Sequence, residues 1–161
     1  MWTEEQIEKA KEDFRVFVFI VWKMIGLPNP TYIQYAIACT LQHPPNDRFI
    51  IEGFRGVAKS FLTCAYVVWR LWKDPQLKVL VVSASKDRAD ANAIFIKKII
   101  MTIPFLKHLI PDPSKGNRDT MQIFDVAPAV PDISPSVRIY FMTSALPSSF
   151  SFISAIHSFF G

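Results

Sequence analysis

A glycine loop followed by lysine and serine is the stretch of this sequence best suited to chemistry. Residues 53–60 read Gly-Phe-Arg-Gly-Val-Ala-Lys-Ser, which fits the pattern G-x-x-x-x-G-K-[S/T] except at Ala58, where the pattern has glycine. Glycines let backbone N–H groups turn inward around a phosphate, and a helix that follows aims its N-terminus at the same anion. The spacing predicts a nucleotide-phosphate site. The alternative is a turn between a strand and a helix that holds no ligand.

Particular side chains of this loop are predicted to hold ATP and Mg²⁺. Lys59 is expected to reach the β- and γ-phosphates, and the Ser60 hydroxyl to bind Mg²⁺. Arg55 is a candidate for stabilising charge at the γ-phosphate, with a solvated surface charge as its alternative. Ala58 is expected to fit if its backbone angles stay in the helical region. The loop residues expected to contact the cofactor are Gly53, Arg55, Gly56, Val57, Ala58, Lys59 and Ser60.

Alternating strands and helices are predicted to position the loop. Residues 48–52 are rich in β-forming apolar residues, and residues 59–72 carry apolar residues at helical spacing. Residues 77–83 form a continuous apolar strand of the type buried in a parallel sheet. Ser85 can cap a further helix with one apolar face, and residues 121–126 are a candidate strand. The order predicts an α/β fold with a parallel sheet flanked by helices.

Helices are also predicted ahead of the loop. Thr3 and Gln6 fit a capping box that starts a helix running to about Met24, and residues 31–41 form a second helix. The apolar run at residues 16–22 is far shorter than the roughly 20 residues that span a bilayer. The acidic start is unlike a secretion signal, so a cytoplasmic location is expected.

Composition restricts the class of protein. Half of the 161 residues are hydrophobic, which argues against intrinsic disorder, and the net charge of +4 suits contact with nucleic acid without requiring it. Cys39 and Cys64 lack metal-ligand spacing, and both are expected to be reduced and buried.

The composition changes sharply near the end. All 18 Lys and Arg and all 14 Asp and Glu lie in residues 1–138, and residues 139–161 are uncharged. A frameshift near residues 138–150 is the preferred account. A natural truncated product is the second. A membrane segment is the third, and the serines, Pro147 and His157 argue against it.

Several signatures in order resemble the large terminase subunit of short-tailed, podovirus-type bacteriophages. They cover nearly all of residues 14–138 and are far more specific than the loop alone. The signatures are residues 19–23, Pro30-Thr31 with Gln34, and residues 54–60, 69–76, 82–92, 94–97, 124–126 and 134–137.

The resemblance implies an additional-strand P-loop NTPase domain, of which residues 1–138 are the N-terminal part, in a motor that packages double-stranded DNA into procapsids. It implies a portal protein, a small terminase subunit and a homo-oligomeric ring as partners, in the host cytoplasm and without a membrane. Gln34 resembles the glutamine that contacts adenine, Arg55 the loop arginine that senses the γ-phosphate, and Lys59 and Ser60 the phosphate and Mg²⁺ groups. The alternative for Gln34 is an ordinary polar residue on an exposed helix.

Two elements that the resemblance implies are expected to be absent. One is an apolar strand ending in acidic residues that hold Mg²⁺ and activate water; no acid occurs after residue 138, and Asp125 and Asp132 lie too early. The other is the metal-dependent nuclease domain. Hydrolysis by the chain as it stands is therefore expected to be very slow.

Two other functions stay open at this stage. One is a non-enzymatic nucleotide-binding or interaction module that competes with an intact subunit, and the other is a different nucleic-acid ATPase such as a helicase. Basic residues could face DNA, although a solvated surface is the better explanation for them. These residues are Lys97, Lys98, Lys107, Lys115 and Arg118.

Overall fold

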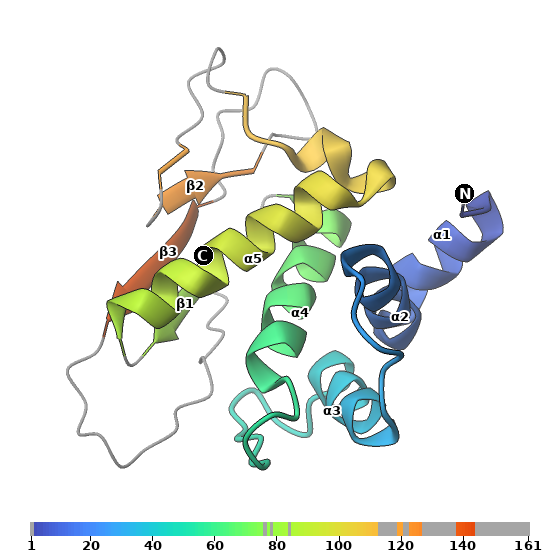
Figure 1. Cartoon of the computed structure of the whole chain (residues 1–161), viewed down its shortest axis with the longest axis horizontal. Coiled ribbons are helices and arrows are strands. Elements are labelled where there is room, and N and C mark those ends of the chain that lie inside the picture. Colours follow the sequence, from blue (N-terminus) through green and yellow to red (C-terminus); the bar gives the residue numbers. More distant parts are fainter. Residues whose placement is uncertain are drawn as a thin grey trace.

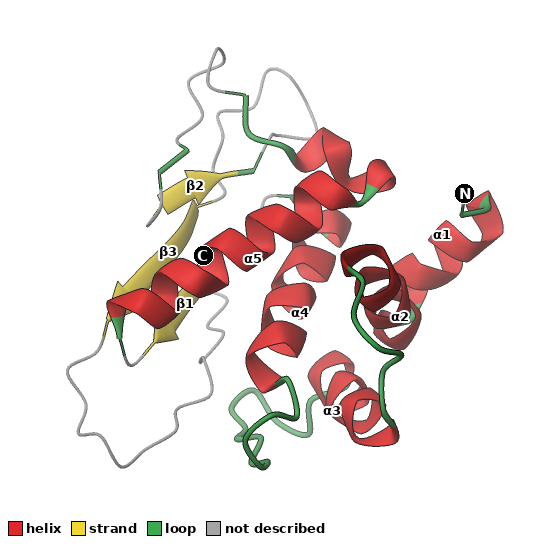
Figure 2. Cartoon of the chain, viewed as in Figure 1, coloured by secondary structure: helices red, strands yellow, loops and turns green. Residues whose placement is uncertain are grey.

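The computed structural model describes residues 2–75, 77, 79–83, 85–112, 119–120, 123–126 and 138–143. Helices dominate these residues, and a small sheet lies on one side of them (Figures 1 and 2). The helices are α1 (Glu4–Glu12), α2 (Phe14–Ile25), α3 (Tyr32–Gln42), α4 (Lys59–Lys73), α5 (Lys86–Thr102) and the 3-10 helix η1 (Pro104–Leu109). The strands are β1 (Val79–Ser83), β2 (Ile123–Asp125) and β3 (Arg138–Thr143).

Helix α4 forms the centre of the molecule. In Figure 1 it runs between the N-terminal helices and the sheet, with α5 crossing it, and it contacts α1, α2, α3 and α5. Ten of its fifteen residues are buried, because apolar side chains occupy more than one face of the helix. Aromatic rings from α2 and α4 pack together, with the ring centroid of Phe14 5.3 Å from those of both Tyr66 and Trp69. This aromatic packing holds the N-terminal helices against α4.

The single helix predicted from Thr3 to about Met24 is wrong, because the chain breaks at Asp13. Asp13 has extended backbone angles, and its carboxylate accepts a hydrogen bond from the backbone N–H of Arg15, capping α2. The Arg15 guanidinium also pairs with this carboxylate at 2.7 Å and lowers the pKa of Asp13. The predicted capping box of Thr3 and Gln6 at the start of α1 is confirmed.

Side chains from other helices satisfy the backbone groups that this break leaves without helical partners. The Gln42 amide donates to the carbonyl oxygen of Glu12 and accepts from the N–H of Phe14, both at 2.8 Å. The indole N–H of Trp69 donates to the carbonyl oxygen of Ala10 at 2.9 Å. Buried backbone groups need such partners, so α3 and α4 hold the break in place.

The described sheet is mixed and has the strand order β1-β3-β2. β1 and β3 are parallel, with Val79 opposite Ile139, whereas β2 runs antiparallel to β3. Among the described residues, the strands predicted at residues 77–83 and 121–126 are present at 79–83 and 123–125, but β2 is not parallel to its neighbour as expected. β3 spans the compositional boundary at residue 138, so residues 139–143 belong to the same sheet as β1. The rest of the uncharged segment lies outside the described residues.

Helix α5 covers the sheet much as its sequence predicts. Ser85 caps it by accepting from the N–H of Arg88, and the predicted apolar face is buried against β1, β3 and α4. Ser83 at the end of β1 accepts a hydrogen bond from the side chain of Asn92 at 3.1 Å. The buried residues of α5 are Ala89, Ala93, Ile96, Ile99 and Ile100.

The strand predicted at residues 48–52 is wrong. These residues form no strand, and the side chain of Ile50 is 82% exposed. A strand needs a neighbour to pair with its backbone, and none of the described strands pairs with this segment. Its β-rich composition alone does not make it a strand.

The two cysteines differ in environment, which corrects the prediction that both are buried. Cys64 on α4 is buried, and burial raises the pKa of its thiol to about 12. Cys39 is exposed on α3, and both cysteines are free. None of the helices in the described part of the chain is long and apolar enough to cross a bilayer.

Candidate functional site

The glycine loop leads directly into the first turn of α4, and two of its residues have left-handed backbone angles. Gly56 has a φ of 97° and Ala58 a φ of 67°. In the described residues, Ala58 is the only non-glycine residue with positive φ. A β-carbon at Gly53 would meet side-chain atoms of Val57 and Lys59 no closer than 3.4 Å, which is ordinary contact. The backbone conformation therefore favours glycine at positions 56 and 58, whereas position 53 does not require it.

Ala58 does not have the helical angles under which its methyl group was expected to fit. The left-handed region places a β-carbon close to the carbonyl oxygen that follows and costs about 1–2 kcal/mol for an L-residue other than glycine. The left-handed angles at position 58 are thus kept with an alanine in place, at that cost.

Replacing Ala58 with glycine should stabilise the chain. Relief of the left-handed strain outweighs the added freedom of the unfolded chain, which leaves a gain of about 0.5–1 kcal/mol in the free energy of unfolding. Urea denaturation measures it. The matched control is Ala91→Gly on the exposed side of α5, which should lose about 1 kcal/mol. A loss of stability in both variants would show that Ala58 is unstrained.

Lys59 turns its amine back over the loop. Its Nζ atom donates to the carbonyl oxygen of Gly53 at 2.5 Å and to that of Phe54 at 3.0 Å. The ammonium group therefore sits at the opening of the loop, and it forms no ion pair with an acid of the described chain. A positive charge in this place is available to an anion held by the loop.

The N-terminus of α4 differs from those of the other α-helices. Thr3, Asp13, Thr31 and Ser85 each cap one of those helices with a side-chain oxygen. Ala58 precedes α4 and offers no such cap. The first N–H groups of α4 thus have no side-chain acceptor among the described residues, and the positive end of the helix dipole points into the loop. Ser60 is exposed in this first turn.

Gln34 is the residue outside the loop that the structure brings to it. Its Nε2 atom donates to the carbonyl oxygen of Val57 at 3.3 Å, and its Oε1 atom accepts from the N–H of Thr31 at 3.0 Å. Val57 is buried, so this carbonyl lies where the loop meets the core. A contact between Gln34 and the nucleotide was predicted only from the resemblance to the terminase family. The bond to Val57 was not predicted, because it joins residues 23 positions apart.

The other predicted site residues are less closely tied to this arrangement. Arg55 is exposed in the turn of the loop. Asp125 is buried on β2, and Asp132 lies outside the described residues. The structure thus brings Gln34 to the loop at Val57, folds the Lys59 amine back onto the loop, and leaves Arg55 at the surface.

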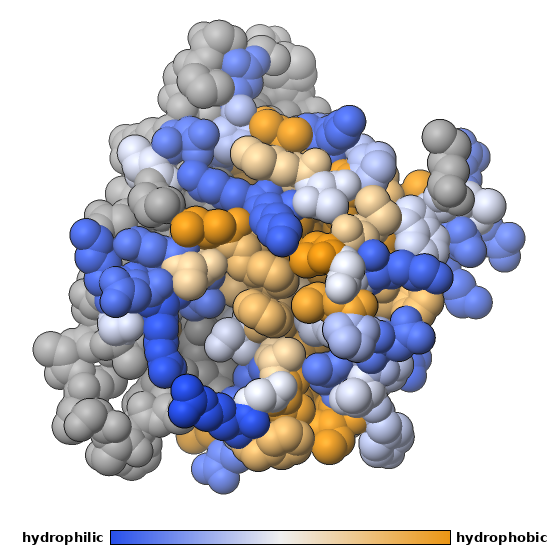
Figure 3. All heavy atoms as spheres, in the orientation of Figure 1, coloured by the Kyte–Doolittle hydropathy of each residue, from blue (hydrophilic) through white to orange (hydrophobic). Residues whose placement is uncertain are grey.

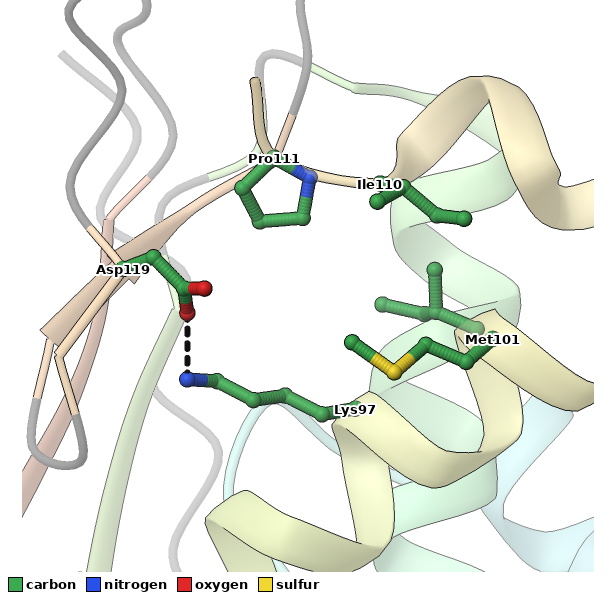
Figure 4. A pocket seen from close by; sticks show the side chains of 6 residues that line it. Lys97, Met101, Ile110, Pro111 and Asp119 are labelled. Atoms are coloured by element: carbon green, nitrogen blue, oxygen red, sulfur yellow. Dashed lines mark hydrogen bonds and ion pairs between the residues drawn. The ribbon is translucent and has the colours of Figure 1, made fainter. Parts of the chain in front are cut away.

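Of the basic residues proposed to face DNA, Lys97 is engaged within the chain. Its amine pairs with the Asp119 carboxylate at 2.5 Å (Figure 4). The same amine donates to the carbonyl oxygen of Thr120. The hollow beside this pair has a volume of about 10 Å³, roughly the space of one water molecule. Lys98 and Lys107 are exposed, and Lys115 and Arg118 lie outside the described residues. On the face of the molecule shown in Figure 3, hydrophilic side chains surround apolar side chains at the centre.

A search of protein-family models finds no match. The chain is 52% identical over 143 residues to the protein described as "Terminase, large subunit" from Enterobacteria phage T3, which is 89% of this chain and 24% of that relative. Over the matched residues, the chain is a homologue of this terminase large subunit. The resemblance drawn from the ordered signatures is confirmed.

The terminase homologue spans about a quarter of the length of the relative it matches. Identity of this level over most of the chain establishes shared ancestry for that portion. The matched region extends well beyond the glycine loop, so the relationship does not depend on the imperfect pattern at Ala58.

Proposed function

We propose that this chain carries the ATP-binding part of a viral DNA-packaging motor. ATP would bind at the glycine loop, with Lys59 and the N-terminus of α4 facing its phosphates and the Ser60 hydroxyl on Mg²⁺. Arg55 would reach the γ-phosphate from the loop. The fold would be an additional-strand P-loop NTPase, with β1 and β3 as two of its parallel strands.

The observation that carries the proposal is the α4 N-terminus. It lacks a side-chain cap, follows two left-handed residues, and has Lys59 turned back over it. These features fit a bound anion: backbone donors, a helix dipole and one positive charge meet at one loop. The first turn of α4 also contains no acidic residue that would oppose a phosphate.

The biological setting follows from the relative and forms part of the proposal. A packaging motor acts on double-stranded DNA with a portal protein and a small terminase subunit, as a ring of identical subunits in the host cytoplasm. The exposed Lys98 and Lys107 are the described residues of the proposed basic group best placed to meet a phosphate backbone.

Calorimetric titration with ATP–Mg²⁺ tests nucleotide binding. We expect saturable one-to-one binding with a dissociation constant in the micromolar range, weakened when a chelator removes Mg²⁺, because the metal neutralises charge between the phosphates. ADP should compete for the same site. A chain that is folded by circular dichroism yet shows no binding at millimolar ATP would contradict the proposal.

A further inference from the structure

The side-chain amide of Gln34 joins two parts of the molecule that the backbone does not connect directly. One end of the amide accepts from the N–H of Thr31 and completes the capping box of α3. The other end donates to the carbonyl oxygen of Val57, one residue before the left-handed Ala58. The amide therefore links the start of α3 to the last turn of the loop.

This link controls the orientation of one peptide group. A peptide is planar and trans, so the carbonyl of Val57 and the N–H of Ala58 point in opposite directions. Holding the carbonyl toward Gln34 turns the Ala58 N–H away from α3. Ala58 is also the residue that enters α4, so the orientation of this peptide affects how the loop presents its donors.

We propose that Gln34 is a positioning residue for the phosphates, acting through the Val57 carbonyl, and that this role does not require the nucleotide base. This inference rests on the proposed function, because it concerns the same loop. It differs from the role that the resemblance implies, in which Gln34 contacts adenine. Both ends of its amide already have protein partners, so a contact with the base must compete with them or use the remaining amide hydrogen.

The chain offers variants that separate the two ends of this amide. Gln34→Glu keeps an oxygen for the N–H of Thr31 but removes the donor to Val57, because a carboxylate only accepts hydrogen bonds. Gln34→Met removes the donor without adding charge near the phosphates. Gln6 occupies the same place in the capping box of α1, with Oε1 3.0 Å from the N atom of Thr3. Gln6→Glu and Gln6→Met therefore repeat the helix-cap changes away from the loop.

The experiment titrates each folded variant with tripolyphosphate–Mg²⁺ and with ATP–Mg²⁺. Loss of one hydrogen bond that orders the loop should weaken both ligands by a similar factor, about 3- to 10-fold, in Gln34→Glu and in Gln34→Met. The Gln6 variants should bind both ligands like the unchanged chain. Melting temperatures of the Gln6 and Gln34 variants show how much of any change comes from the helix cap.

Three results would overturn the inference. Weaker ATP binding with unchanged tripolyphosphate binding would assign Gln34 to the base, and unchanged binding of both would leave it no role in the site. Weakening in Gln34→Glu alone would point to charge repulsion, not to loop position. Failure of the proposed function would give a different result. The unsubstituted chain would then bind neither ligand, or Lys59→Ala would bind both ligands as tightly as the unsubstituted chain.

Discussion

Replacing Lys59 with alanine should weaken ATP–Mg²⁺ binding by about 10- to 100-fold, the range expected for hydrogen bonds to a charged group. The amine lies over the loop, where it contacts the carbonyl oxygens of Gly53 and Phe54. A triphosphate offers it negatively charged oxygens, to which an ammonium group binds more strongly than to neutral carbonyls. Calorimetry on the variant measures the change in the dissociation constant.

The free chain should tolerate this change much better than the complex does. The two hydrogen bonds of Lys59 in the free chain are exposed, so their loss should change the free energy of unfolding by less than about 1 kcal/mol. Lys98→Ala, which removes an exposed positive charge from α5, is the matched control and should bind ATP normally. Equal affinities in the unchanged chain and Lys59→Ala would reject the phosphate-loop assignment.

The largest effect on stability is expected for Trp69→Ala, a loss of about 3–5 kcal/mol in the free energy of unfolding. Trp69 is 3% exposed and packs against Phe14 and Tyr66. Its indole also donates to the carbonyl oxygen of Ala10, near the end of α1. Removing it leaves both a cavity in the aromatic packing and a buried acceptor without a partner. Urea denaturation followed by far-ultraviolet circular dichroism measures the loss.

Phenylalanine substitutions separate the hydrogen bond from the packing. Trp69→Phe keeps a ring but loses the donor to Ala10, and about 1–3 kcal/mol should follow from the unsatisfied carbonyl alone. Trp72 lies one turn later on α4 and packs on Phe17 and Phe105, so Trp72→Phe serves as the control for ring size. If the two variants lose equal stability, the bond to Ala10 does not stabilise the break between α1 and α2.

The sequence predicted the helices better than the strands, and the reason is local. Thr3, Thr31 and Ser85 cap the helices that they were expected to cap or begin, because a cap depends on residues within one turn. The strand at residues 48–52 was wrong because strand formation depends on a partner far away in sequence. The mixed direction of the sheet has the same origin, since nothing in residues 123–125 indicates which way they will run.

Two features of the molecule could not be predicted from nearby residues. The apolar pattern of residues 4–25 favoured one long helix. The break at Asp13 was missed because Gln42 and Trp69, which stabilise it, come from other helices. At the candidate site, the pattern identified the loop and Lys59. The left-handed angles of Ala58 and the bond from Gln34 to Val57 depend on how α3 and α4 pack.

The strand order also has a consequence for synthesis on the ribosome. β3 is the middle strand and the last of the three in the sequence, and it forms the ladders with both β1 and β2. β1 and β2 therefore emerge before β3, the strand with which each of them pairs in the described sheet. Helices α1 to α4 contact one another within the first 73 residues, so they can pack while the sheet is still incomplete, whereas α5 also contacts β3.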